Sequence, residues 1–223
     1  IQSYYNTFCQ PTDQVVAHFH EWMTCSGSLY LRKNSPYVST VMTTHATVMG
    51  RCIAGNHMPL YNKLSSYNAD ELARKFNVTS KHSIEKIAAN TCDAFVTVSN
   101  ITALECQYLL SKSPDVVTPN GFENDFVWKG EQYDEKRKEA RRAMIAVAEA
   151  CLGYHFEKEP LIVGTSGRYE FRNKGLDIFF DALKKVANDN KLDREILAYV
   201  TVPAAHNGAR TDLQTFLKDS NNK

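Results

Sequence analysis

Short apolar runs alternate along the chain with segments in which apolar residues recur at helical spacing. Runs rich in β-branched and aromatic residues predict strands at 15–22 (ending in a polar turn), 38–44, 94–98, 116–118, 161–163 and 196–202. Helical spacing predicts helices at 26–32, 80–90, 101–110, 131–152 and 176–186, while 61–76 is helical or irregular. Strands and helices in alternation are typical of an α/β fold built on parallel sheets.

A change of composition divides this pattern in two. Residues 134–152 change from almost all charged to rich in Ala, Met, Ile and Val, which one long helix with a solvated first half explains. Gly153 is a suitable residue to end this helix. A polar connector at 156–160 then leads into a second α/β unit. We therefore predict two domains, at 1–153 with the long helix included and at 160–223.

The charge balance limits the classes of partner. The chain has 26 basic and 25 acidic residues, a net charge of +1, which predicts no bulk attraction to nucleic acid or to a membrane surface. The basic residues within 136–142 alternate with Glu135 and Glu139 and form a solvated helix face. No apolar run approaches the ~20 residues of a membrane span. The N-terminus is neither a signal peptide nor a start methionine, so we expect a piece of a longer chain, with a frayed polar tail at 219–223.

The cysteines give no framework for a metal or a disulfide. The six are scattered without a CxxC pair, at Cys9, Cys25, Cys52, Cys92, Cys106 and Cys151. Zinc-ribbon and thioredoxin-like sites both need that closer spacing. We interpret the cysteines as reduced, mostly buried thiols of a cytoplasmic protein.

The loop between the predicted strand at 161–163 and the helix at 176–186 is the strongest candidate site. It contains glycines, so that backbone can approach a ligand closely, and it carries Arg168 and Lys174 just before a helix N-terminus. A helix N-terminus favours anions through its free N–H groups and its dipole. The two added cations predict a phosphate or diphosphate site. The alternative is that both are paired on the surface with Glu170 or Asp177.

Other polar residues follow predicted strands. His20 and Glu21 follow the first, His45 the second and Asn120 the fourth. In open parallel sheets, ligands bind beyond the carboxyl ends of the strands. These side chains and the Arg168 loop could therefore line one cleft.

Each of these residues has an alternative interpretation. His20, Glu21 and His45 are residue types that suit zinc, but no HExxH-like spacing accompanies them. His45 alone is also consistent with a hydrogen-bonded core histidine, and Asn120 with a simple turn. A nucleophilic Cys25 has only its nearness to His20 in the sequence in its favour.

Taken in order, these stretches resemble the eukaryotic-type glycogen (starch) synthases, which are retaining glycosyltransferases. The stretches are VAHFHEW at 16–22, TTHATVMGR at 43–51, SIEKIAA at 83–89, FVTVSNITALE at 95–105, PNG at 119–121 and GRYEFRNKG at 167–175. The resemblance spans most of 15–203 and is far more specific than a single glycine loop.

The resemblance implies the GT-B architecture, in which two Rossmann-like domains face each other across a cleft. Residues 1–153 would be the later part of the first domain and 160–223 the start of the second. The family transfers glucose from a nucleotide sugar, usually UDP-glucose, to the 4-hydroxyl at the non-reducing end of an α-glucan such as glycogen. The anomeric configuration is retained, and neither a metal nor another cofactor is required. The choice between UDP and ADP, allosteric control and a homo-oligomeric parent stay open.

The same resemblance assigns roles to single residues. Arg168 and Lys174 match the pair that holds the donor diphosphate, and Arg51 matches an arginine near the donor or product phosphates. The leaving group is a nucleoside diphosphate, and fixed cations stabilise its growing negative charge.

Three further residues match positions around the transferred sugar. His45 matches the histidine beside the glucose, near the reacting carbon, and is the catalytic candidate. Asn120 and Glu21 align with sugar-contacting positions.

The chain also departs from the family's pattern. It lacks the amino-terminal lysine–glycine–glycine loop, the glutamate motif of the later second domain and the arginine-rich helix that binds glucose 6-phosphate, and 202–208 follows the family only loosely. We therefore expect the 223-residue chain to be inactive by itself. The alternatives are another GT-B glycosyltransferase, of the sucrose or trehalose type, and a non-catalytic phosphate- or glucan-binding module.

Overall fold

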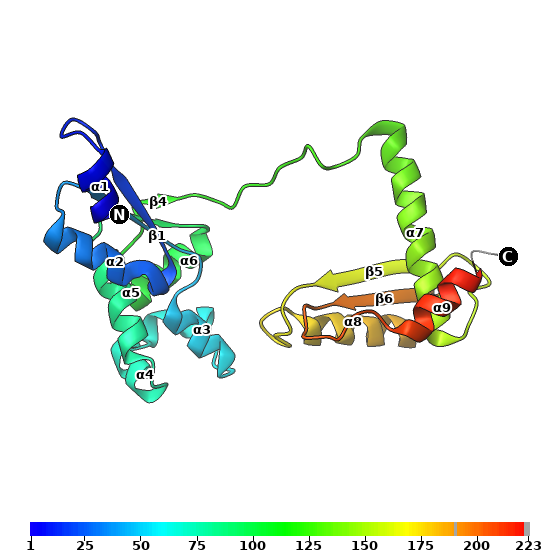
Figure 1. Ribbon diagram of the computed structural model, residues 1–223. Helices are drawn as coiled ribbons and strands as arrows, with labels where there is room; N and C mark the ends of the chain where they lie inside the picture. Colours follow the sequence, from blue (N-terminus) through cyan, green and yellow to red (C-terminus); the bar gives the residue numbers. More distant parts are fainter. Residues whose placement is uncertain (190, 221–223) are drawn as a thin grey trace. The chain divides into compact units, whose positions relative to one another are not determined.

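The computed structural model describes residues 1–189 and 191–220. The chain divides into two compact units, residues 1–122 and 123–223 (Figure 1). Of the predicted frayed tail at 219–223, Asp219 and Ser220 belong to the last helix and the remaining residues lie outside the described ones.

The first unit is built on a parallel sheet, as the sequence predicts. Its described strands are β1 (Val16–His20), β2 (Ser39–Thr44), β3 (Ala94–Thr97) and β4 (Val116–Val117), which pair in chain order. All three pairings are parallel. The carboxyl ends of these strands therefore lie at one edge of the sheet.

Helices precede and connect the strands of this unit. They are α1 (Gln2–Phe8), α2 (Glu21–Asn34), α3 (Val48–Gly55), α4 (Ala69–Lys75), α5 (Thr79–Thr91) and α6 (Asn100–Glu105), with a 3-10 turn η1 (Tyr61–Ser66) and a π-helical turn η2 (Cys106–Leu110). The predicted start of α2 at residue 26 is wrong by five residues, because the helix follows β1 without a loop. Ser99 caps α6 by accepting a hydrogen bond from Thr102 N, which confirms the predicted cap.

Apolar side chains of one sheet face pack against helices. Met42 of β2 and Phe95 of β3 are fully buried against Cys25 of α2 and Ala88 of α5. A second cluster forms between α3, α4 and η2, around Met49, Ile53, Leu64, Ala69, Ala73 and Leu109. The first cluster fixes α5 on the sheet and the second packs α3 against α4 and η2, and α3 and α5 carry residues of the candidate site.

The second unit contains a parallel pair of strands, β5 (Leu161–Ser166) and β6 (Ile196–Thr201). Its described helices are α7 (Gly130–Leu152), α8 (Leu176–Asp189) and α9 (Thr211–Ser220). Strand β5 continues through Gly164, where the sequence predicted a break, because Gly164 still pairs with Tyr199 of β6. Gly153 ends α7 with φ at +63°, the left-handed backbone that glycine adopts without steric cost.

The long helix α7 packs within the second unit. It contacts α9, and the Tyr199 hydroxyl of β6 donates a hydrogen bond to the Met144 carbonyl. Arg141 also forms an ion pair with Glu159, with 2.6 Å between Nε and Oε1. The division between the compact units at Phe122 and Glu123 thus differs from the sequence-based boundary after 153. The domain boundary of the family stays a prediction.

All six cysteines are free. Cys25 and Cys106 are buried, and burial raises the pKa of both thiols to about 12. The Cys25 thiol donates to the Glu21 carbonyl oxygen at 3.2 Å. A thiol with so high a pKa is a poor nucleophile, so the Cys25 alternative is not supported. Among the described residues, no helix is long and apolar enough to cross a bilayer.

Candidate functional site

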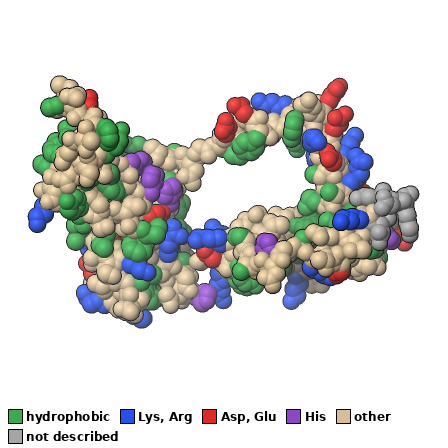
Figure 2. Space-filling model, in the orientation of Figure 1, with side chains coloured by type: hydrophobic (Ala, Val, Ile, Leu, Met, Phe, Trp, Pro, Cys, Tyr) green, Lys and Arg blue, Asp and Glu red, His purple; other side chains and the backbone are tan. Residues whose placement is uncertain are grey.

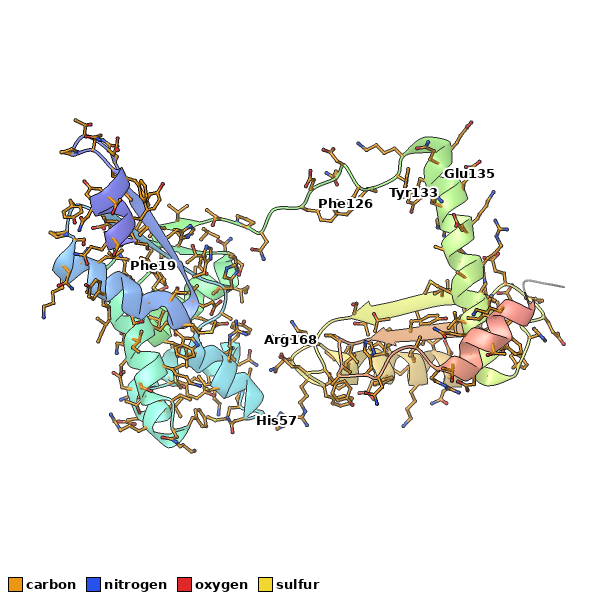
Figure 3. All side chains as sticks on the ribbon, in the orientation of Figure 1. Phe19, His57, Phe126, Tyr133, Glu135 and Arg168 are labelled. Atoms are coloured by element: carbon orange, nitrogen blue, oxygen red, sulfur yellow. The ribbon has the colours of Figure 1, made fainter. Side chains whose placement is uncertain are left out.

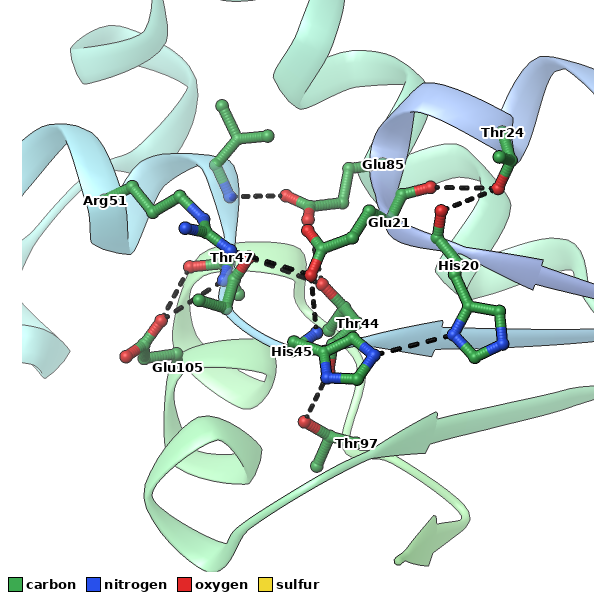
Figure 4. A network of polar contacts seen from close by, with 12 residues as sticks. His20, Glu21, Thr24, Thr44, His45, Thr47, Arg51, Glu85, Thr97 and Glu105 are labelled. Atoms are coloured by element: carbon green, nitrogen blue, oxygen red, sulfur yellow. Dashed lines mark hydrogen bonds and ion pairs between the residues drawn. The ribbon is translucent and has the colours of Figure 1, made fainter. Parts of the chain in front are cut away.

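The carboxyl ends of β1 and β2 bring three of the predicted site residues together. His20 ends β1, Glu21 begins α2, and His45 directly follows β2. Figure 4 shows their side chains grouped with those of α3 and α5. The strand ends thus bring His20, Glu21 and His45 together, and a single cleft shared with Asn120 and the Arg168 loop stays a prediction.

Glu21 holds the backbone beside His45. Its Oε1 accepts a hydrogen bond from His45 N at 3.0 Å and lies 3.6 Å from Arg51 Nη2. The Glu21 backbone has φ at +62°, a left-handed conformation that is uncommon for a residue with a side chain. That conformation turns the chain sharply from β1 into α2 and aims the carboxylate at the end of β2. Glu21 therefore links His45 with Arg51.

Histidine rings line the exposed side of the same sheet edge, and Figure 2 shows histidine side chains gathered on the surface of the first unit. His18 and His20 are two residues apart on β1 and so share one face, with ring centroids 4.2 Å apart. His20 Nδ1 lies 3.5 Å from His45 Nε2, and His18 Nε2 lies 2.8 Å from Thr43 Oγ1. Partial burial, together with the neighbouring His20, lowers the pKa of His18.

Two buried carboxylates hold the segment that follows β2, and sequence analysis did not single out either one. Glu85 of α5 is fully buried, and its two oxygens accept from Thr44 Oγ1 at 3.1 Å and from Val48 N at 2.9 Å. Glu85 lies on the buried stripe of α5 with His82, Ala88 and Ala89. A charged residue on an apolar helix stripe is a signal that the sequence does contain.

Glu105 of α6 is the second buried carboxylate. Its Oε2 accepts from Thr47 Oγ1 at 2.9 Å, and its Oε1 accepts from the Tyr61 hydroxyl at 2.9 Å. Burial, with the carboxylate beside it, raises the pKa of Tyr61 to about 12. Thr47 in turn caps α3 by accepting from Gly50 N at 2.9 Å. Glu105 thus fixes the start of the helix that carries Arg51.

Gly50→Ala is expected to destabilise the first unit by about 2 kcal/mol, a typical cost of overpacking. A Cβ at residue 50 would overlap the Glu105 carboxylate and lie 2.8 Å from Thr47 Oγ1. Gly55→Ala in the same helix is the control, since a Cβ there meets nothing within 4 Å. Urea unfolding measures both, and equal stability of the two variants would contradict the packing described here.

The stability of the chain is expected to depend on pH through Glu85. Burial raises the pKa of its carboxyl from 4.5 to about 7. The folded chain then binds the proton more tightly than the unfolded chain, so the unfolding free energy falls as pH rises from about 4.5 to about 7. Because each pKa unit corresponds to 1.36 kcal/mol, Glu85→Gln should reduce this fall in the unfolding free energy by up to about 3 kcal/mol. Urea unfolding of both chains at pH 5 and pH 8 measures the difference, and parallel pH dependences would refute it.

The described residues do not form a metal site at these strand ends. Within 1–189 and 191–220, no three His, Cys, Asp or Glu side chains are grouped so that they could hold a metal ion. His20, Glu21 and His45 are near one another, but Glu21 faces the His45 backbone and Arg51. Its carboxylate is therefore already engaged.

The loop with the two predicted phosphate-binding cations lies between β5 and α8, as predicted, and Figure 3 labels Arg168 on it. Arg168 Nη2 lies 2.9 Å from Glu170 Oε1, so the predicted surface pairing with Glu170 is present here. The Arg168 side chain is nevertheless 61% exposed, and an exposed ion pair contributes little free energy. A doubly charged ligand can therefore compete for Arg168.

The aliphatic part of Lys174 lies against Gly167, where an added Cβ would be 3.6 Å from its Cδ. Gly175 follows with φ at +67° and leads the chain into α8. Asn120 lies beyond β4 in the first unit, and its side chain is exposed. The phosphate-binding role of Lys174 and the sugar-contacting role of Asn120 stay predictions.

Comparison with known proteins decides the family. The family model described as glycogen synthase matches residues 2–216. The chain belongs to the glycogen synthase family. The resemblance drawn from the sequence motifs is thereby confirmed, and the parallel α/β units are the architecture expected of it.

Curated relatives in the glycogen synthase family support the same assignment. The chain is 33% identical over 219 residues to "Glycogen [starch] synthase" of Dictyostelium discoideum, covering 94% of this chain and 25% of that protein. It is 34% identical over 196 residues to that of Neurospora crassa, covering 85% and 28%. It is 32% identical over 203 residues to "Glycogen [starch] synthase, liver" of Homo sapiens, covering 86% and 28%. The chain thus spans about a quarter of the length of these curated relatives.

Proposed function

We propose that the longer protein containing this chain transfers glucose from UDP-glucose to the non-reducing end of an α-1,4-glucan such as glycogen, with retention. The observation that carries the proposal is the match of 2–216 to the glycogen synthase family, with the motif residues placed on strand ends and on a strand–loop–helix. The bond between the anomeric carbon and the diphosphate breaks and the nucleoside diphosphate leaves. The 4-hydroxyl oxygen of the acceptor bonds to that carbon, and the hydroxyl proton leaves with the diphosphate.

Arg168, Lys174 and Arg51 are proposed to bind phosphates. Among the described residues, Glu170 is the ion-pair partner of the exposed Arg168 guanidinium, and Arg51 is 46% exposed with Glu21 3.6 Å away. Both cations can therefore turn to an anionic ligand without leaving a buried partner unpaired. Their charge would stabilise the departing diphosphate, whose negative charge grows in the transition state.

His45 is proposed to contact the transferred glucose near the reacting carbon. Its backbone N–H is fixed by Glu21, and its Nε2 lies beside His20, which leaves the partly exposed ring at the sheet edge. Glu21 and Asn120 are proposed to contact the sugar. Because Glu21 already bonds the His45 backbone, we expect its contribution to include the placement of His45.

The setting of the reaction is also a proposal. Free thiols at all six cysteines agree with a reducing compartment, so we propose a cytoplasmic protein. The partners proposed are the UDP-glucose donor and the glucan acceptor, without a cofactor, a nucleic acid or a membrane. A homo-oligomeric parent stays a hypothesis.

A panel of donors and acceptors tests the function. The longer protein should use UDP-glucose or ADP-glucose with glycogen, and it should leave fructose and glucose 6-phosphate unglucosylated. Synthesis of sucrose or of trehalose phosphate would favour the alternative glycosyltransferases. Binding of glycogen without transfer from any donor would favour the non-catalytic module. The 223-residue chain alone is expected to be inactive, and transfer by the purified chain would refute that expectation.

A further inference from the structure

One side chain, Glu85, ties together both ends of the turn that carries His45. The turn runs from Thr44, the last residue of β2, to Val48, the first residue of α3. Glu85 Oε1 accepts from the Thr44 hydroxyl at 3.1 Å, and Glu85 Oε2 accepts from Val48 N at 2.9 Å (Figure 4). His45 lies between these two anchored residues.

We propose that Glu85 is a positioning residue for His45 and Arg51. It acts by clamping the 44–48 turn and the first N–H of α3. The inference rests on the proposed function for what His45 and Arg51 do to the substrate. The inference goes beyond the proposed function because it assigns a role to Glu85, a fully buried residue of α5.

The position of Glu85 explains why this clamp needs an acceptor. Val48 N is the first N–H of α3, and Glu85 is the hydrogen-bond partner found for it among the described residues. Besides Glu85, the described residues give Thr44 Oγ1 a long second contact, 3.5 Å from the Ala46 carbonyl oxygen. Loss of the Glu85 oxygens would leave a buried backbone donor unpaired, so the turn would shift to reach another acceptor.

A shift of the 44–48 turn would also move the residues of the candidate site, because neighbouring side chains bond to them. Glu21 bonds His45 N at 3.0 Å and approaches Arg51 at 3.6 Å, so it depends on where the turn places both residues. Glu105 holds Thr47 from the opposite helix but does not contact Thr44 or Val48 in the described structure. Thr44 is also held by Thr97 of β3, whose hydroxyl donates to the Thr44 carbonyl oxygen at 2.8 Å, so the Val48 end of the turn depends most on Glu85.

Two substitutions of Glu85 by residues of similar size show whether its hydrogen-bond acceptors, rather than its volume or its charge, hold the turn. Glu85→Gln keeps an oxygen for Val48 N, and its amide can donate to the Thr44 hydroxyl oxygen. Glu85→Met fills the same volume without any strong acceptor. Glu85→Met leaves Val48 N unpaired and is expected to lower stability, so circular dichroism of the variant checks that it folds. A clamp predicts that Gln preserves the site and Met does not.

Amide hydrogen exchange in this chain tests the clamp without any assay of activity. Glu85→Met should speed exchange at Val48 and His45 at least tenfold relative to Met42 in the middle of β2. Glu85→Gln should change that ratio less than threefold. The control is His82→Ala, a buried neighbour on α5 whose Nε2 faces Asp70 at 3.1 Å, and it should leave the ratio unchanged.

Kinetics of the longer protein test the consequence. Glu85→Met should lower kcat about 100-fold with KM within threefold, the loss that a misplacement of about 1 Å can cause, and Glu85→Gln should stay within fivefold. Unchanged exchange in the Met variant, equal loosening in His82→Ala, or faster exchange with normal kcat would each overturn the proposal. A protein without transferase activity would refute the proposed function and leave the exchange result to decide the clamp.

Discussion

Arg168→Ala and Lys174→Ala, each made in the longer protein, are expected to lower kcat/KM for UDP-glucose by at least ~10²-fold, the scale for removing one fixed group that stabilises transition-state charge. Both side chains lie on the loop between β5 and α8, and neither is buried in the core of its unit. Their removal should therefore change activity with little effect on folding. Steady-state kinetics with thermal unfolding of the same variants measures both.

Arg172 supplies the matched control for these two variants. It lies on the same loop and is exposed, but it matches none of the phosphate-binding positions. Arg172→Ala should retain activity within a few-fold. Glu170→Gln should also stay active, because it removes the competing partner that lies 2.9 Å from Arg168. Near-normal turnover in both Arg168→Ala and Lys174→Ala would refute the role proposed for this loop.

His45→Ala is expected to lower kcat by about 100-fold, since it removes a group proposed to act on the sugar in the transition state. KM for the donor should change less than kcat, because the phosphates are proposed to be held by other residues. Rapid-mix or steady-state measurement of kcat in the longer protein gives the result.

The control for His45→Ala is His57→Asn, in the segment after α3. His57 has φ at +60°, and Asn tolerates that left-handed backbone. The variant removes a histidine from the same unit without touching the strand ends. Loss of activity in both variants to the same extent would indicate a general effect of histidine removal and contradict the specific role of His45.

Much of the fold could be predicted because local chemistry and tertiary packing agree there. The end of α7 at Gly153 follows from glycine's access to left-handed backbone, and the start of α6 follows from the Ser99 cap. Strand β5 was predicted too short, because pairing with β6 outweighs the weak strand preference of Gly164. Helices α1 and α3 were not predicted as such, because they are short, at 7 and 8 residues, and their boundaries depend on packing and capping.

Of the candidate site, the residues at the strand ends could be predicted from the sequence, but the buried carboxylates behind them could not. His20, Glu21 and His45 follow strands, and a parallel sheet brings strand ends together. The buried groups were missed because Glu85 and Glu105 are far from Thr44 and Thr47 in the sequence, 41 and 58 residues away. The pairing of Arg168 with Glu170 was foreseen as an alternative, and it is compatible with a phosphate site because the pair is exposed.

The most direct test of the central claim is transfer of labelled glucose from UDP-glucose to glycogen by the longer protein, with and without Arg168→Ala. The account predicts that the wild type extends glycogen by α-1,4-linked glucose with retained configuration. It also predicts that the variant loses at least ~10²-fold of that rate. No transfer to glycogen from UDP-glucose or ADP-glucose, or an Arg168→Ala variant as fast as the wild type, would contradict it.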